Sequence, residues 1–164
     1  MPKPVARREA KPNKTIAMRQ LDNLGVPYQA SWHRPIHDAE TAAQERGIPL
    51  SQIVKSLLVL LPGRRYALAL VQGDKKLSLH KLGTVLGQKG LEMAPHDHVA
   101  IVTGYEPGSV SPFGLKRHLP IVVDQAVMEL EQVSISGGRA DAAISLTPGD
   151  LLRATKATVA DITQ

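Results

Sequence analysis

Groups that could hold a small polar ligand are concentrated in residues 103–116 (TGYEPGSVSPFGLK). Three glycines and two prolines keep this segment from running as a regular helix or strand. A second, shorter segment at 136–139 (SGGR) has the same character. Both segments can place bare backbone N–H groups along a cavity wall, where they would hold a carbonyl oxygen that gains charge during acyl transfer. Each segment is equally compatible with an ordinary loop that needs glycine for its turns.

Lys55 is the second chemical feature, because it lies inside the apolar run QIVKSLLVLL at 52–61. Burying an unpaired ammonium group is costly, so such a lysine needs a partner or a route to water. One interpretation is a positive charge on the floor of a pocket, holding a phosphate, carboxylate or amide oxygen. The alternative is a lysine at a strand end whose ammonium group reaches solvent. The pattern by itself is compatible with both.

Other catalytic groups find less support in the sequence. Six histidines are present, and His33 with His37, or His96 with His98, have spacings that a metal could use, but no HExxH pattern accompanies them. We therefore expect no metal and no cofactor, and we place His33 and His37 at a pocket rim. The chain has no cysteine, which excludes a thiol nucleophile and thiolate metal sites. No GxSxG motif surrounds any serine, which argues against a serine-triad hydrolase.

Charge and composition separate a short tail from the rest of the chain. Residues 1–14 contain five basic residues against one acidic residue, so most of the net charge of +5 belongs to them. We expect residues 1–14 to be a basic disordered tail, either an arm that grips a phosphate backbone or a solubilising extension. No apolar run approaches the roughly 20 residues of a membrane span, and no secretory signal is recognisable. A cytoplasmic protein without membrane contact is therefore expected.

The pattern of elements predicts a single mixed α/β domain over residues 15–164. The run at 51–61 has apolar residues on both faces, so it should be a central strand covered on both sides. Strands occur singly, in pairs and between helices, which favours a mixed sheet over a doubly wound parallel one. We expect helices at 14–24, at 38–47 capped by Asp38 or Thr41, from Ser78 onward, at 94–102 and from Thr147, with strands at 26–32, 51–61, 66–71, 119–123, 131–135, 142–146 and 156–162.

Six short motifs follow one another in a recognisable order. They are H-R-P at 33–35, I-V-K-S-L at 53–57, L-x-L-x-K-L at 77–82, T-G-Y-x-x-G-S-V-S-P-F-G at 103–114, S-G-G-R at 136–139 and D-L-L at 150–152. This order resembles the YbaK/ProX family of aminoacyl-tRNA deacylases, which is related to the editing domain inserted in bacterial prolyl-tRNA synthetases. The resemblance covers residues 15–162.

The resemblance implies both a fold and an activity. The fold is a compact α/β domain around a mixed, barrel-like sheet with flanking helices. The activity is hydrolysis of the ester that joins a wrong amino acid to the 3′ end of a tRNA, in most members a tRNA for proline carrying a small non-cognate amino acid. The implied partners are the mischarged tRNA and prolyl-tRNA synthetase or another translation factor, with the protein acting as a monomer or homodimer.

The resemblance also assigns roles to residues. Lys55 aligns with the family's essential lysine, and Gly108 aligns with a glycine whose backbone lies at the substrate carbonyl, so both are predicted to be catalytic. Substrate contacts are predicted for His33, Gly104, Ser109, Ser111, Ser136, Gly137 and Gly138. From charge alone, Lys81, Lys116 and Arg117 are candidates for tRNA phosphate contacts.

Two points stay open at this stage. The family's cysteine-clearing branch tends to have Gly-Gly-Ile-Ser-Pro where this chain has GSVSP at 108–112, so cysteine, alanine, serine and threonine all remain candidates for the cleared amino acid. The activity also has two competitors. One is a module that binds tRNA or a nucleotide in association with a synthetase without cleaving it. The other is a hydrolase for a small ester or amide unrelated to tRNA.

Overall fold

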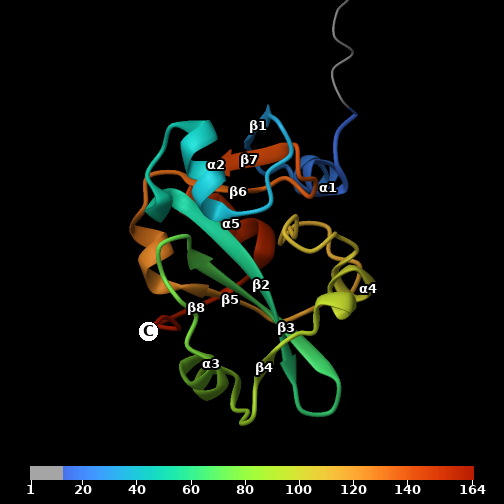
Figure 1. The fold of residues 1–164 in the computed structure, drawn as a ribbon, viewed down its shortest axis with the longest axis vertical. Coiled ribbons are helices and arrows are strands. Elements are labelled where there is room, and N and C mark those ends of the chain that lie inside the picture. Colours follow the sequence, from blue (N-terminus) through green and yellow to red (C-terminus); the bar gives the residue numbers. More distant parts are fainter. Residues whose placement is uncertain (1–12) are drawn as a thin grey trace, which may run out of the picture.

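The long antiparallel hairpin of β2 (Ile53–Leu61) and β3 (Arg65–Gln72) forms the centre of the sheet (Figure 1). The computed structural model describes residues 13–164, so most of the predicted tail lies outside the described residues. The strand order is β1–β7–β6–β2–β3–β5–β8, and β4 pairs with β2. The strands other than β2 and β3 are β1 (Gln29–Trp32), β7 (Ala142–Leu146), β6 (Val133–Ser136), β5 (Ile121–Asp124), β8 (Thr158–Ala160) and β4 (Glu92–Met93).

Both parallel and antiparallel ladders occur in this sheet, which confirms the predicted mixed α/β class. β2 runs parallel to β6 and β3 runs parallel to β5, whereas β2–β3 and β6–β7 are antiparallel. The even residues Val54 and Leu58 belong to the larger apolar core, while Leu57 and Val59 belong to or pack against a second one. β2 is therefore covered on both faces, as its composition predicts.

All the described α-helices except α4 begin at a side chain that accepts a hydrogen bond from the first turn. They are α1 (Ile16–Leu24), α2 (Ala39–Arg46), α3 (Leu79–Leu86), α4 (Val99–Thr103) and α5 (Pro148–Thr155). Four of them have N-caps that accept from the backbone N–H three residues later, namely Thr15, Asp38, Ser78 and Thr147. Asp38, and not Thr41, is thus the cap of α2. None of the described helices is long and apolar enough to cross a membrane.

Several predicted element boundaries differ from those of the structure, and three of the differences are instructive. The helix expected at 94–102 is divided into a 3₁₀ turn at His96–His98 and the short α4, and Pro95 before them is extended and lies outside both. The strand expected at 26–32 begins only at Gln29. A 3₁₀ turn at Gln125–Glu129 follows β5 and is absent from the predicted elements; Asp124 caps it.

The two glycine-rich segments lie against each other. The Ser136 hydroxyl donates to the Ser109 carbonyl oxygen at 3.0 Å and accepts from the Gly138 N–H at 3.1 Å. Gly138 has φ +90°, and a Cβ at this position would lie 2.6 Å from Cε1 of Tyr105. The Tyr105 hydroxyl donates in turn to the Phe113 carbonyl oxygen. Segments far apart in the chain therefore form one rigid wall.

Replacing Gly138 with alanine should destabilise the fold. The new Cβ combines a strained backbone conformation with an overlap against the Tyr105 ring, so we expect the free energy of unfolding to fall by about 2–4 kcal/mol. Urea titration measures this loss. Gly149→Ala is the matched control, because a Cβ there meets nothing closer than 4.0 Å. Equal unfolding midpoints for the two variants would contradict this packing.

Candidate active site

A cavity of about 370 Å³ opens between α2, the start of β2, the loop after α4 and the β6–β7 turn. Figure 1 shows α2 beside β2, with α3 at the other end of the molecule. Apolar side chains from α2 and β2 form part of the lining, and Lys55 and Gly108 both line the same cavity. The structure thus brings together the two residues predicted to be catalytic, which are separated by more than fifty positions in the chain.

The cavity lies where β2 loses its neighbour on one side. β2 pairs with β6 only at Ile53 and Val54, and with β4 only at Val59 and Leu60. The Gly73 N–H donates to the Ile53 carbonyl oxygen on the β3 side. In an antiparallel pair, the N–H and C=O groups of successive residues point alternately toward the partner strand and away from it. The backbone groups of residues 55 and 57 therefore also point toward β3. Those of residue 56 point the other way, into the space between β6 and β4.

Ser56 consequently offers an unused backbone donor and acceptor to the cavity. Residue 56 takes no part in the ladders with β6 or β4, and no turn or loop of the described residues bonds to its N–H or carbonyl oxygen. The Ser56 hydroxyl is buried without a hydrogen bond, although buried polar groups normally find partners. The free polar groups of Ser56 therefore mark a place where a ligand can bind to the strand edge.

Lys55 is half-buried at this gap. Its ammonium group donates to the Lys75 carbonyl oxygen at 2.8 Å, in the turn that follows β3. Burial lowers the pKa of Lys55 from its ordinary value, and the nearby Asp74 carboxylate partly opposes that shift. The ammonium group is thus anchored at one point and keeps two N–H donors for another oxygen.

Gly108 presents backbone instead of a side chain to the cavity. The Ser109 N–H donates to the Glu106 carbonyl oxygen at 2.9 Å and closes a turn with Pro107 and Gly108 at its centre. The φ of +82° at Gly108 is the value required at the third position of a type II turn. The Gly108 N–H takes no part in closing such a turn. A Cβ at this position would approach the His37 carbonyl oxygen to 3.3 Å.

Cations outnumber acids around the cavity. Arg46, Lys55 and Arg139 line it, together with the single carboxylate of Asp38. The pKa of Asp38 is held below its ordinary value mainly by the hydrogen bond from the Thr41 backbone N–H. Burial lowers the pKa of Arg46, whose guanidinium donates to the Ser134 hydroxyl at 2.7 Å and keeps a buried Nε–H without a partner. The cavity is therefore suited to a ligand with phosphate, ester or carbonyl oxygens.

The family model of the aminoacyl-tRNA editing domain matches residues 33–154, a span that includes every lining residue of this cavity. The chain belongs to the aminoacyl-tRNA editing domain family. This membership confirms the resemblance found in the motifs, and with it an aminoacyl-tRNA deacylase activity, that is, hydrolysis of the ester of a mischarged tRNA.

Relatives of this editing domain include both separate proteins and parts of larger ones. It is 30% identical to the Enterococcus faecalis protein named "Putative Cys-tRNA(Pro)/Cys-tRNA(Cys) deacylase EbsC", over 92% of this chain and 93% of that protein. It is 35% identical to a region of the proline–tRNA ligase of Geobacter metallireducens, over 79% of this chain and 21% of the ligase. The chain thus spans about a fifth of the ligase's length.

A solved structure shows the same fold. The crystal structure described as "a putative trans-editing enzyme for prolyl tRNA synthetase" superimposes with a TM-score of 0.85 at 30% identity. The match covers 93% of this editing domain and 98% of that chain.

Several predicted substrate contacts of the editing domain lie outside the cavity lining. Of the predicted residues, Lys55, Gly108 and Ser136 line it. Those that do not are His33, Gly104, Ser109, Ser111, Gly137 and Gly138. The Gly137 N–H is taken by the Ala142 carbonyl oxygen and the Gly138 N–H by Ser136, so neither is free to hold an oxyanion, contrary to one interpretation of the SGGR segment. Gly104 instead ends α4, with its backbone against Lys116.

His33 contacts Arg46, and the sequence analysis predicted only His33 as a site residue. His33 Nε2 lies 3.4 Å from the Arg46 guanidinium, so it sits behind a lining residue and does not face the cavity itself. Arg46 had no place among the predicted site residues. A signal was present, because Ala42 and Arg46 are four residues apart on α2 and therefore share the face that packs on the sheet.

The environment of Lys55 predicts a titration that NMR can follow. Its pKa should lie below the ordinary lysine value, because burial disfavours the charged form. Asp74→Asn should lower that pKa further, since the carboxylate is the group that opposes the shift. Titration of a ¹³C-labelled lysine Cε resonance, assigned through Lys55→Arg, measures both values. An unchanged or higher pKa in Asp74→Asn would show that the ammonium group does not sense this carboxylate.

Proposed function

We propose that this editing domain acts in trans and removes a small non-cognate amino acid from tRNA, with tRNA for proline as the principal substrate. The observation that carries the proposal is the cavity in which Lys55 and the Gly108 turn meet the unpaired edge of β2. Similarity along almost the whole length of the E. faecalis relative supports action as a separate protein, and similarity to proline–tRNA ligases supports the choice of tRNA. We place this deacylation of mischarged tRNA in the cytoplasm.

The mechanism of ester hydrolysis depends on which hydrogen-bond donors in the cavity have no protein partner. The ester carbonyl lies between the Gly108 turn and the β2 edge, where the N–H groups of Gly108 and Ser56 donate to the oxygen as it becomes negative. A water molecule attacks the acyl carbon, the bond from that carbon to the ribose oxygen breaks, and this oxygen takes up a proton. Within residues 13–164, the candidate bases in the lining are exposed His37 and Asp38, and the Asp38 carboxylate is already bonded to Thr41. We therefore assign the orientation of the water to the neighbouring ribose hydroxyl.

Lys55 supplies charge to this arrangement. Its remaining donors reach an oxygen of the terminal nucleotide or of the acyl group, while the Lys75 carbonyl oxygen fixes the direction of the side chain. In a partly desolvated wall an ammonium group interacts more strongly with such an oxygen than it would in water. Lys55 therefore contributes both to holding the substrate and to stabilising the developing negative charge.

The size of the cavity favours a small amino acid. Its volume of about 370 Å³ is near the lower end of ligand pockets, and the same space must admit part of the terminal ribose. Ala39 and Ala42 of α2 pack in one apolar cluster with Ile53 of β2, and all three line the cavity. An apolar or hydroxyl side chain of the size of alanine, serine, cysteine or threonine fits this wall.

Contacts with the body of the tRNA are proposed for exposed cations on the same segment as the Gly108 turn. Lys116 and Arg117 follow that turn and are exposed. Lys81 lies on α3, where its ammonium group pairs with Asp161 at 3.0 Å and donates to the Thr163 carbonyl oxygen. We therefore assign the phosphate contacts to Lys116 and Arg117 and not to Lys81. Their contribution should weaken as salt rises.

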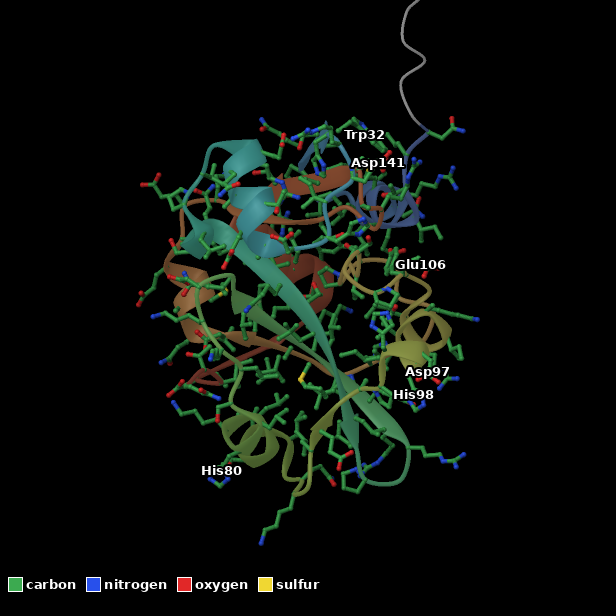
Figure 2. The ribbon with its side chains drawn as sticks, in the orientation of Figure 1. Trp32, His80, Asp97, His98, Glu106 and Asp141 are labelled. Atoms are coloured by element: carbon green, nitrogen blue, oxygen red, sulfur yellow. The ribbon has the colours of Figure 1, made fainter. Side chains whose placement is uncertain are left out.

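The central test is a panel of mischarged tRNAs with wild-type protein and Lys55→Ala. We expect the wild type to release a small amino acid from tRNA for proline, and Lys55→Ala to do so about 100-fold more slowly, which is the scale of losing one group that stabilises a developing oxyanion. His80→Ala is the control and should keep the wild-type rate, because His80 lies on α3 (Figure 2). Wild-type rates in Lys55→Ala, or no release from any tRNA, would refute the proposal.

The role of the Ser56 N–H can be tested by replacing one atom. Incorporating the α-hydroxy analogue of alanine at position 56 exchanges this N–H for an ester oxygen, while Ser56→Ala keeps the N–H and removes only the hydroxyl. We expect kcat to fall about 100-fold in the ester variant and little in Ser56→Ala. Circular dichroism confirms folding of both. Equal kcat values in the two proteins would exclude this N–H from the reaction.

A further inference from the structure

We propose that Trp32 and Arg139 form a stacking platform for the terminal nucleobase of the tRNA 3′ end. This inference rests on the proposed function, because it concerns the nucleotide that carries the ester. Arg139 lines the catalytic cavity, and its guanidinium carbon lies 5.5 Å from the centre of the Trp32 ring. Trp32 ends β1, opposite Ala142 of β7, and Figure 2 shows it close to Asp141.

The guanidinium group of Arg139 is held from two directions. Trp32 lies against it as an aromatic surface, and Asp141 accepts its Nη2–H at 2.9 Å. The side chain nevertheless remains 51% exposed. A planar group fixed in this way keeps part of its surface free at the mouth of the cavity. Guanidinium planes and aromatic rings are the two kinds of surface on which proteins stack unpaired bases.

The backbone beneath this pair is also fixed. The His33 N–H donates to the Asp141 carbonyl oxygen at 2.9 Å, and the Ile36 N–H donates to the Ala140 carbonyl oxygen at 2.8 Å. The segment after β1 is therefore tied to the β6–β7 turn that carries Arg139. A pre-organised platform costs little entropy when a base binds to it.

A base fits Arg139 better than a phosphate does. Asp141 already neutralises much of the charge of Arg139, whereas Lys55 and Arg46 line the same cavity and have no carboxylate within ion-pair distance in residues 13–164. Phosphate oxygens would therefore prefer Lys55 or Arg46. The ester is carried by the ribose of the last nucleotide, so the base of that nucleotide necessarily arrives at the mouth when the acyl group enters.

The test removes the base and the platform separately and together. Substrates are mischarged minihelices with either a normal terminal adenosine or a terminal nucleotide that lacks its base. For the wild type, we expect loss of the base to raise KM about 5- to 100-fold, with kcat little changed. For Arg139→Ala, we expect a similar rise with the normal substrate and little further rise when the base is removed. Equal effects of base removal in the two proteins would overturn the platform.

Matched variants separate stacking from charge and from folding. Trp32→Phe and Arg139→Gln retain flat side chains and should keep KM within a few-fold of the wild type, whereas Arg139→Lys retains charge without a plane and should behave like Arg139→Ala. Arg153→Ala removes an exposed, ion-paired arginine of α5 and should change nothing. A wild-type KM in Arg139→Lys would refute stacking as the source of the effect.

A binding measurement keeps this inference distinct from the proposed function. Trp32 is the only tryptophan of the chain, so its fluorescence reports directly on the platform. The uncharged trinucleotide CCA should shift Trp32 emission, and Arg139→Ala should weaken that binding by at least about fivefold. No change of emission with CCA would refute the platform even if deacylation is found. A shift of emission without deacylation of any tRNA would refute the proposed function and leave the platform standing.

Discussion

The interruption of pairing along one side of β2 is the constraint on which the site depends. Strand β6 leaves β2 after Val54, and β4 joins it only at Val59, so the backbone of Ser56 faces a cavity between them. A sheet edge inside a folded protein is normally covered or paired, since its polar groups are expensive to leave unmet. Here the edge is enclosed by α2 and by two loops, and a ligand can complete it.

Rigid loops turn this gap into a defined site. The hydroxyl of Ser136 joins the β6–β7 turn to the Gly108 loop, and the close approach of Gly138 to Tyr105 fixes the distance between them. Ser109, Ser136 and Gly138, all predicted from the sequence to contact substrate, therefore also hold the walls together. Catalysis by oriented N–H groups requires this, because such donors act only if they do not have to reorganise during the reaction.

The cations of the cavity divide into different environments. Lys55 is anchored to a carbonyl oxygen. Arg46 ends α2 and lies partly buried between Ser134 and His33. Arg139 lies over the Trp32 ring and pairs with Asp141. In the proposed function, this distribution matches an aminoacyl-tRNA end, in which a polar ester lies between a phosphate, a ribose and a flat base. The apolar residues of α2 in the lining would then contact the amino-acid side chain.

Short-range patterns in the sequence determined most of the individual elements. The caps at Thr15, Asp38 and Ser78 set helix starts, and the Pro107–Gly108 pair produced a tight turn whose conformation only glycine adopts easily. The apolar run around Lys55 predicted a central strand, and the motif order predicted the family. The caps, the turn and the strand depend on neighbouring residues and so follow from local stereochemistry, whereas the family followed from the order of motifs along the chain.

Only the tertiary structure decided which groups meet and which remain free. The register of β2 against β6 and β4 left Ser56 unpaired. The pairing of β1 with β7 placed Arg139 over the ring of Trp32, about a hundred positions away in the chain. The N–H groups of Gly137 and Gly138, by contrast, find their partners within the β6–β7 hairpin itself, at the Ala142 carbonyl oxygen and the Ser136 hydroxyl. Sequence fixes which donors and charges exist, but their availability depends on hydrogen bonds and burial between distant segments, which arise only when the chain packs.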